Sequence, residues 1–391
     1  MVVNLNPPNA IGDISWIKPG KSSWDWWNAS QQSGVKNPGD NNGKNNKTIK
    51  YCIDFCAQNN LEYMLIDGGW SKSSPAPQGK IGYSFRGPMD LRKSVPAIDI
   101  PMLVEYAKSK NVHIWVWAHF RDVNDQMDTA FAQFEKWGIV GVKIDFLDRS
   151  DQWMVNWYRT AARKAAGYHL MLDFHGAFKP DGMSRTFPNV LTREGVMGEE
   201  YNRWSARITP RHNVTLAFTR MLAGPLDYTP GGFNNATPEN FISRSANFMV
   251  KGTRVHQTAL FVVYESEFQI VSDSPANYDG QKELAFIKAV PSSWDETRVL
   301  NGVPAKYITI ARRKGNEWFI GCITEDSLKI DLSLNFLENG SYNAEIYSDG
   351  PNADKQPKNS VVKFRRVNKN TILKLKLAEG GGWAARIEKV K

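Results

Sequence analysis

The feature that most constrains the fold of this chain is an alternation of short apolar runs with amphipathic helical segments. It extends over about the first 290 of the 391 residues. The short runs are rich in β-branched residues. In the longer segments apolar residues recur every three or four positions, as Met127, Phe131, Phe134 and Trp137 do. Strands that alternate with helices in this way are typical of parallel βαβ units.

The expected elements follow the apolar runs. Strands are expected over 13–17, 62–66, 113–118, 141–146, 169–174, 190–192 and 226–229. Helices are expected over 49–58, 101–110, 126–137, 152–166 and 211–222, while the apolar stretch 253–264 forms a last strand or its helix. The length of the repeat favours a (β/α)₈ TIM barrel over an open doubly wound sheet. No glycine-rich phosphate loop follows any of the strands, which argues against a nucleotide-binding fold.

The pattern changes near residue 297. From there to the C-terminus short runs alternate polar with apolar residues, and turn signals such as Asn339-Gly340 separate them. This is typical of antiparallel strands. We therefore expect two domains, a catalytic barrel over 1–296 and a small β-sandwich over 297–391.

Composition excludes several classes of protein. Hydrophobic residues make up 41% and charged residues 23%, as in globular chains. No apolar run reaches the roughly 20 residues of a membrane span, and the N-terminal segment lacks the features of a signal peptide. The three cysteines have neither zinc nor disulfide spacing, so we expect buried thiols.

The net charge of +9 raises the question of a nucleic-acid partner. The basic residues are spread along the chain, and those near the C-terminus alternate with apolar residues as on the solvent face of strands. No nucleic-acid-binding motif accompanies them. The charge is therefore better explained as a solvated surface, and no nucleic acid is expected.

Chemically active side chains gather at the expected strand ends. In a TIM barrel the carboxyl ends of the strands form the active site. The residues at those ends are Trp16, Asp67, Lys143, Asp145, His175 and Glu194. The chain also holds 14 tryptophans, and flat aromatic rings stack on the apolar faces of sugars. Carboxylates, a histidine, a lysine and tryptophans on one rim are what a glycosidase needs.

Two of these groups leave alternatives open. Lys143 and Asp145 are two apart on one strand and so point to the same side. The lysine could keep a nucleophilic carboxylate ionised, or the pair could be a salt bridge inside the barrel. The segment 193–201 holds three glutamates, which could supply a general acid and oxygen ligands for Ca²⁺, or could form an acidic surface loop.

Five segments carry a specific resemblance: GDISWIKPGKSSWDWW, EYMLIDGGW, GVKIDFLDRSDQ, LDFHGAFKPDG and LTREGVMGEEYN. In this order they resemble glycoside hydrolase family 97, over essentially the whole chain. They are also similar to the wider clan of α-galactosidase barrels. The resemblance implies that full-length members carry a large N-terminal β-sandwich domain, and we expect no counterpart of it within these 391 residues.

The resemblance implies roles for individual residues. Asp145 matches the nucleophile of the retaining members. Inverting members carry a general-base glutamate directly after the histidine of the fifth strand, where this chain has Gly176. Both features imply retention, with carboxyl groups about 5–5.5 Å apart. The general acid matches Glu200, whereas Glu199 is the weaker candidate by motif register.

The remaining roles are also implied by the resemblance. Glu194 matches a Ca²⁺ ligand, and Glu200 resembles one as well. The residues expected to bind sugar hydroxyls are His175, Asp67, Lys143 and Trp16.

The expected function is release of terminal α-linked galactose from an oligosaccharide or another α-galactoside by double displacement. An α-glucosidase or a related α-glycosidase such as a pentopyranosidase is the nearest alternative. A sugar-binding protein without catalysis is a second class of alternative. The resemblance implies a periplasmic or secreted protein, and the sequence leaves the oligomeric state open.

Overall fold

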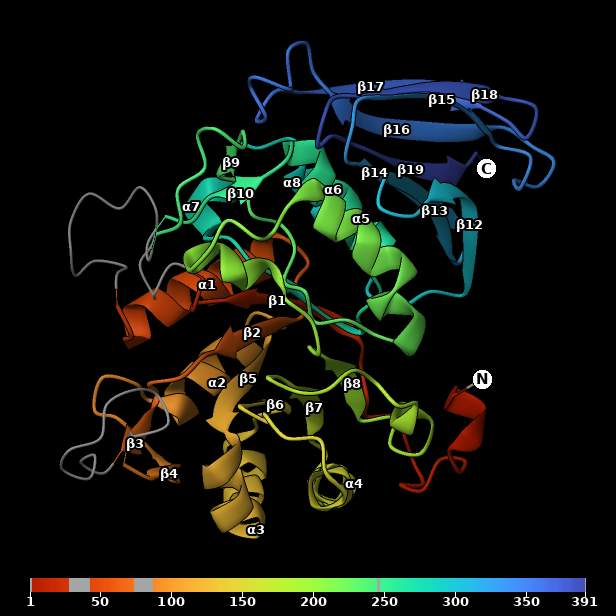
Figure 1. The fold of residues 1–391 in the computed structure, drawn as a ribbon. Helices are drawn as coiled ribbons and strands as arrows, with labels where there is room; N and C mark the ends of the chain where they lie inside the picture. The colour runs from red at the N-terminus through yellow and green to blue at the C-terminus, as the bar shows by residue number, and fades with distance from the viewer. Residues whose placement is uncertain (1, 28–42, 74–86, 245–246, 391) are drawn as a thin grey trace. The chain divides into compact units, whose positions relative to one another are not determined.

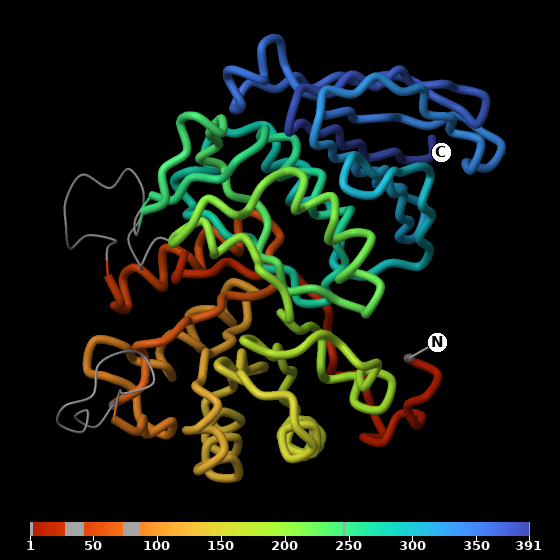
Figure 2. The backbone as a smooth tube through the Cα atoms, viewed as in Figure 1, coloured from red at the N-terminus to blue at the C-terminus, as the bar shows by residue number. Residues whose placement is uncertain are grey.

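The computed structural model describes residues 2–27, 43–73, 87–244 and 247–390 (Figures 1 and 2). Within them the chain forms two compact units. The first comprises Met1–Val196 with Ala223–Asp227, and the second comprises Met197–Leu222 with Tyr228–Lys391. No described helix combines the length and the apolarity that a membrane crossing requires.

The first unit is organised around parallel strands. In spatial order they are β1 (Gly20–Trp24), β2 (Tyr63–Ile66), β5 (His113–His119), β6 (Gly141–Asp145), β7 (Met171–Phe174) and β8 (Val190–Arg193). Each strand pairs in parallel with the next along the chain. The intervening helices are α1 (Asn46–Gln58), α2 (Ile100–Lys108), α3 (Phe120–Trp137) and α4 (Gln152–Gly167). This sequential order is that of a TIM barrel rather than of a doubly wound sheet. A short antiparallel pair, β3 (Ser71–Ser73) and β4 (Met89–Ser94), follows β2.

Capping residues fix where these helices begin. The side chain of Asn45 accepts a hydrogen bond from the backbone N–H of Thr48 at the start of α1, and Asp151 accepts one from Met154 at the start of α4. Such caps satisfy backbone donors that the helix itself leaves unpaired. Helix α3 ends at Gly138, whose φ of +81° suits glycine.

The second unit combines short helices with antiparallel sheets. The helices are α5 (Pro210–Phe218), α6 (Arg254–Val263), α7 (Pro275–Tyr278) and α8 (Leu284–Ala289), and the short strands are β9 (Asn235–Ala236), β10 (Val250–Lys251) and β11 (Phe268–Val271). Within the described residues the structure also has the 3₁₀ helices η1 (Val2–Leu5), η3 (Met183–Arg185), η4 (Glu199–Arg203) and η5 (Arg220–Ala223).

The C-terminal part of the second unit is a β-sandwich. Its larger sheet has six strands in the order β12 (Glu296–Val303), β13 (Tyr307–Lys314), β14 (Glu317–Thr324), β19 (Gly382–Lys389), β16 (Tyr342–Asp349) and β17 (Ser360–Val367). The smaller layer is the ribbon of β15 (Leu328–Ser333) and β18 (Ile372–Leu377). Buried residues of both layers, among them Trp318, Leu332, Leu375 and Trp383, form one hydrophobic core.

Helix α6 packs on the other face of the larger sheet. All ten of its residues are buried. Two glycines allow the close approach. A Cβ on Gly321 would lie 2.6 Å from the carbonyl oxygen of Ala259, and one on Gly382 would lie 2.3 Å from the backbone nitrogen of His256. Any side chain at these positions would push the helix away from the sheet.

Most expected elements are confirmed, but some are wrong. The first strand is Gly20–Trp24 rather than 13–17, and the described structure has no strand over 226–229. The stretch 253–264 is helical. Strand β1 was missed because its sequence, GKSSW, is mostly polar although every residue is buried. Strands β12 and β19 were also missed. The cysteines are buried thiols, as expected.

Candidate active site

Asp145 ends strand β6 and is held by three contacts. The indole Nε1 of Trp117 donates to its Oδ2 at 2.9 Å. The backbone N–H of Phe146 donates to Oδ1 at 2.6 Å, and Nδ1 of His175 lies 3.1 Å from the same oxygen. The side chain of Asp145 remains 16% exposed. The carboxylate is therefore fixed in orientation yet accessible to a reactant.

Asp145 is ionised. Burial alone would raise its pKa, but the charge and hydrogen bond of His175, the charge of Lys143 and the hydrogen bond of Trp117 hold that pKa well below its usual range. An ionised, oriented carboxylate has the form that a nucleophile needs.

His175 follows β7 and links the acidic groups. Its Nε2 lies 3.4 Å from Oε1 of Glu194 and 3.7 Å from Oδ2 of Asp227, while Nδ1 faces Asp145. Burial would lower the pKa of His175, but the charges of Glu194 and Asp145 raise it well above its usual range. These charges favour the protonated ring, in which both nitrogens are donors.

Lys143 lies two residues before Asp145 on β6 and is buried. It is 1% exposed, its Nζ is 3.7 Å from Oδ2 of Asp227, and it lies 4.4 Å from the centroid of the Trp24 ring. Its cross-strand partner on β7 is Asp173. Lys143 forms an ion pair with Asp227, and its charge also helps to hold the pKa of Asp145 below its usual range.

The sequence placed Asp173 at the end of the fifth strand without giving it a role, and Asp227 was missed. Both are buried, and burial together with the charge of Asp227 raises the pKa of Asp173 well above its usual range. Asp173 is two residues before His175 on β7, so strand alternation could have placed it on the same side. Asp227 lay in a segment expected to be a strand. Asp227 faces both basic side chains, because its Oδ2 lies 3.7 Å from Nζ of Lys143 and 3.7 Å from Nε2 of His175.

Asp67 follows β2 and belongs to the same network. The indole Nε1 of Trp24 donates to its Oδ2 at 2.7 Å, and its backbone N–H donates to Oδ1 of Asp25 at 2.9 Å. Burial raises the pKa of Asp67, and the charges of Lys143 and Lys44 oppose this effect. The structure therefore brings Asp67, Lys143, Asp145, His175 and Glu194 into one connected set.

Trp16 is not part of this set. Its ring packs edge-on against His169, with 5.3 Å between ring centroids. His169 precedes β7 whereas His175 follows it, so Trp16 is placed at the opposite end of that strand. The displacement of β1 toward residue 24 is the reason. Trp24, rather than Trp16, is the tryptophan that contacts Asp67.

Glu194 follows β8 and offers carboxylate oxygens, which are the ligand atoms that Ca²⁺ prefers. Its Oε2 accepts a hydrogen bond from the backbone N–H of Gly176 at 2.7 Å, and Oε1 faces His175. Burial raises the pKa of Glu194, and the charge of His175 opposes this. Ca²⁺ takes about six to eight oxygen ligands, so one carboxylate fits a ligand set but cannot complete it.

Glu199 and Glu200 lie side by side on η4, in the second unit, but differ in environment. Glu199 is fully buried, and this burial raises its pKa well above the usual range. Glu200 is only partly buried. Burial thus favours the neutral form of Glu199, and Glu200 is the more accessible acid of the pair.

Gly176 lies close to the carboxylate of Asp145 and leaves no room for a side chain there. Its φ is +55°, and a Cβ would lie 3.1 Å from Oδ1 of Asp145 and 3.0 Å from the backbone nitrogen of Phe146. A side chain at position 176 and Asp145 in its present orientation therefore compete for the same space.

We expect Gly176→Ala to lower kcat/KM about 100-fold, because small displacements of a reacting group have effects of this size. The left-handed backbone adds a cost of about 1–2 kcal/mol, which thermal unfolding would detect. Gly167→Ala is the matched control, because a Cβ at Gly167 meets nothing within 4 Å. Full activity in Gly176→Ala would show that the orientation of Asp145 does not depend on this glycine.

The fold and this set of residues define a class, the TIM barrels that carry their reacting groups at the carboxyl ends of the strands. Residues 26–196 match the family described as Glycoside hydrolase 97, and residues 293–388 match that described as Glycosyl-hydrolase 97 C-terminal, oligomerisation. The chain belongs to glycoside hydrolase family 97.

Curated relatives agree with this assignment. The chain is 40% identical over 388 residues to a protein of Bacteroides thetaiotaomicron named retaining alpha-galactosidase, covering 98% of this chain and 56% of the relative. It is 31% identical over 386 residues to a probable retaining alpha-galactosidase of Streptomyces bingchenggensis, covering 98% of this chain and 54% of that one. The chain thus spans about half the length of the curated relatives it matches.

Solved structures confirm the fold class. A family 97 enzyme from Pseudoalteromonas sp. strain K8, solved in complex with acarbose, superposes with a TM-score of 0.88 at 34% identity, covering 100% of this chain and 63% of that one. A β-arabinopyranosidase superposes with a TM-score of 0.73 at 23% identity, covering 94% of this chain and 56% of that one, and so shows the fold alone. The (β/α)₈ TIM barrel followed by an antiparallel β-sandwich is confirmed.

Proposed function

We propose that this chain is a retaining, exo-acting glycoside hydrolase that releases terminal α-linked galactose. The observation that carries the proposal is the oriented, ionised Asp145 with a glycine at position 176. An inverting enzyme needs a general base that holds a water, and Gly176 supplies no such group. The names of the two curated relatives support the same activity.

The proposed reaction has two displacements. In the first, Asp145 attacks the anomeric carbon while Glu200 donates a proton to the leaving oxygen, so that a glycosyl ester forms as the glycosidic bond breaks. In the second, Glu200 takes a proton from water, and the water oxygen displaces Asp145 from the sugar. Two inversions at one carbon give overall retention.

The other residues of the set bind and orient the sugar. His175 has two ring nitrogens, Nε2 and Nδ1, from which it can donate hydrogen bonds to sugar hydroxyls. The charge of Lys143 favours the ionised form of Asp145. Asp67 offers carboxylate oxygens to sugar hydroxyls, with its orientation fixed by Trp24. We propose that these three side chains, rather than Trp16, hold the ring.

Ca²⁺ is proposed as the bound cofactor, with Glu194 and Glu200 among its ligands. When bound, the ion supplies positive charge that favours oxygen ligands of the sugar. Glu194 contributes by presenting a buried carboxylate whose second oxygen is anchored by the N–H of Gly176.

Three further properties are proposed from the family. The protein acts in the periplasm or outside the cell, and it self-associates through the region matched by the C-terminal family description. A domain boundary at 296/297 stays a prediction.

Substrate and stereochemistry are tested by two measurements. We expect turnover of 4-nitrophenyl α-galactoside to exceed that of the α-glucoside about 100-fold or more, since a site that hydrogen-bonds one hydroxyl configuration rejects the other. NMR of the first-formed sugar should show the α-anomer. A preference for the glucoside would overturn the choice of galactose, and an initial β-anomer would overturn retention. Sugar binding without hydrolysis would favour a binding protein.

A further inference from the structure

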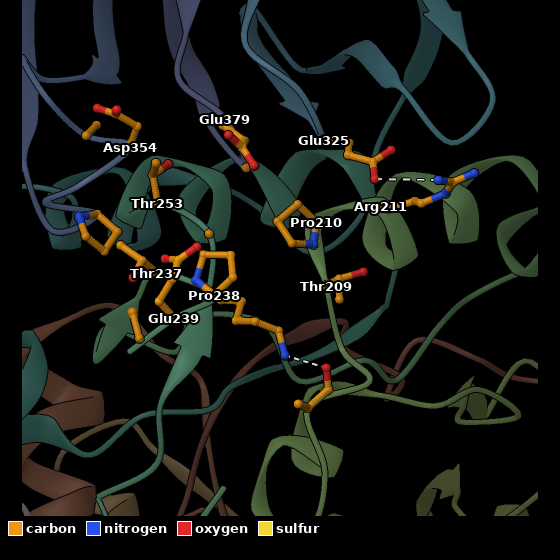
Figure 3. A pocket seen from close by; sticks show the side chains of 17 residues that line it. Thr209, Pro210, Arg211, Thr237, Pro238, Glu239, Thr253, Glu325, Asp354 and Glu379 are labelled. Atoms are coloured by element: carbon orange, nitrogen blue, oxygen red, sulfur yellow. Dashed lines mark hydrogen bonds and ion pairs between the residues drawn. The ribbon is translucent and has the colours of Figure 1, made fainter. Parts of the chain in front are cut away.

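A cavity of about 410 Å³ lies wholly within the second unit (Figure 3). Its wall combines the first turns of α5 and α6, at Thr209 and Thr253, with the β9 and β10 segments and turns of the sandwich. The volume lies in the range of small-molecule sites. None of its lining residues belongs to the set around Asp145, so the proposed hydrolysis does not use this cavity.

One buried cation lines the cavity. Lys251 is 6% exposed, its Nζ donates to the carbonyl oxygen of Ala206, and it lies 4.0 Å from the centroid of the Phe241 ring. Burial lowers the pKa of Lys251 to about 8. A lysine ammonium has three N–H donors, and the hydrogen bond to Ala206 uses one of them. A further donor can therefore serve an uncharged acceptor such as a hydroxyl.

Carboxylates line the cavity in excess. Glu325 lies 3.8 Å from Arg211, which balances its charge. Glu239, Asp354 and Glu379 are exposed on the cavity wall (Figure 3). This excess of negative charge opposes an anionic ligand, while Lys251 opposes a simple cation. A neutral ligand that both donates and accepts hydrogen bonds satisfies both groups.

The apolar part of the wall fits the same chemistry. Pro210, Pro238 and Pro357 line the cavity together with Ala236 and Ala353. Their C–H surfaces can pack against the apolar face of a pyranose ring, while the carboxylates accept from its hydroxyls. Mixed apolar contact and a few directed polar groups are the usual features of a small-molecule site.

We propose that this cavity binds a neutral monosaccharide or disaccharide, as a second sugar site built entirely from the second unit. Glu379 and Glu239 accept hydrogen bonds from ring hydroxyls, and Lys251 donates to one. The site recruits or retains carbohydrate without taking part in bond cleavage.

Calorimetry on a full-length chain with a disabled first site tests the proposal. The background variant is Asp145→Ala with His175→Ala, and the probes are galactose, glucose and maltose, each titrated alone. We expect at least one probe to bind with one-to-one stoichiometry and a Kd on the order of 1 mM. Glu379→Ala and Ala206→Trp, both at exposed positions lining the cavity, should each weaken that binding at least about tenfold.

Glu338→Ala is the matched control, because this carboxylate is 81% exposed and lies outside the cavity lining. It should leave the Kd unchanged. In the otherwise unaltered chain, Glu379→Ala should leave hydrolysis of an aryl galactoside unchanged, so the two sites are tested separately. Absence of binding by all three probes, or binding that Glu379→Ala and Ala206→Trp both leave intact, would overturn the proposal.

Discussion

Replacing Asp145 with alanine is expected to lower kcat/KM for α-galactosides by about 10⁴-fold or more, the scale seen when a nucleophile is removed. The physical reason is that no other ionised, oriented carboxylate in the set has the exposure of Asp145. Glu194 is 9% exposed and is held between Gly176 and His175. The measurement is steady-state hydrolysis of an aryl α-galactoside.

Azide should restore turnover to the Asp145→Ala variant. The small anion can enter the space that the carboxylate leaves and attack from the same face, giving a galactosyl azide of inverted configuration. Asp148→Ala is the matched control, because Asp148 lies three residues further on and is exposed. Loss of activity in that control, or full activity in Asp145→Ala, would remove the basis for naming Asp145 as the nucleophile.

Glu200→Gln is expected to have the second largest effect. Hydrolysis of natural α-galactosides should fall about 10²–10⁴-fold, the usual contribution of a general acid. An aryl galactoside with an acidic phenol as leaving group needs no proton, so its first step should be affected much less. We compare the fall in the hydrolysis rate of the natural galactoside with the fall for the aryl galactoside. A much larger fall for the natural substrate identifies proton donation as the lost function.

Glu199→Gln provides an unusually close control. Because Glu199 is fully buried and burial raises its pKa well above the usual range, an uncharged amide of the same shape should leave activity and the unfolding midpoint nearly unchanged. If Glu199→Gln were the inactive variant and Glu200→Gln the active one, the assignment of the acid would have to be exchanged.

The periodicity of the sequence was enough to predict the parallel strands of the first unit. Strands β5 to β8 are buried on both faces and read as continuous apolar runs, and their carboxyl ends gave Asp145, His175 and Glu194 directly. The exception is β1, whose lysine and serines are buried because the barrel interior is polar there. Hydrophobicity could not reveal it, and the expected position of Trp16 shifted with it.

The charge balance behind the site could not be predicted from the sequence. Asp227 meets Lys143 and His175 only through folding, since it lies 84 and 52 positions away from them in the chain. Asp173 was expected at the end of the fifth strand, but the pattern indicated no role for it. Spacing along one strand gives the direction of a side chain, but the identity of its counter-ions depends on which strands become neighbours.

The burial of α6 has a consequence for dissecting the protein. A fragment beginning at residue 297 would contain the strands of the sandwich, apart from the first residue of β12, yet lack the helix that covers one face of its larger sheet. Residues such as Phe319 and Ile323, now buried, would meet water. We expect such a fragment to aggregate. A fragment that begins before α6 and retains Gly321 and Gly382 would keep this face of the sheet buried under the helix, and we expect it to stay soluble.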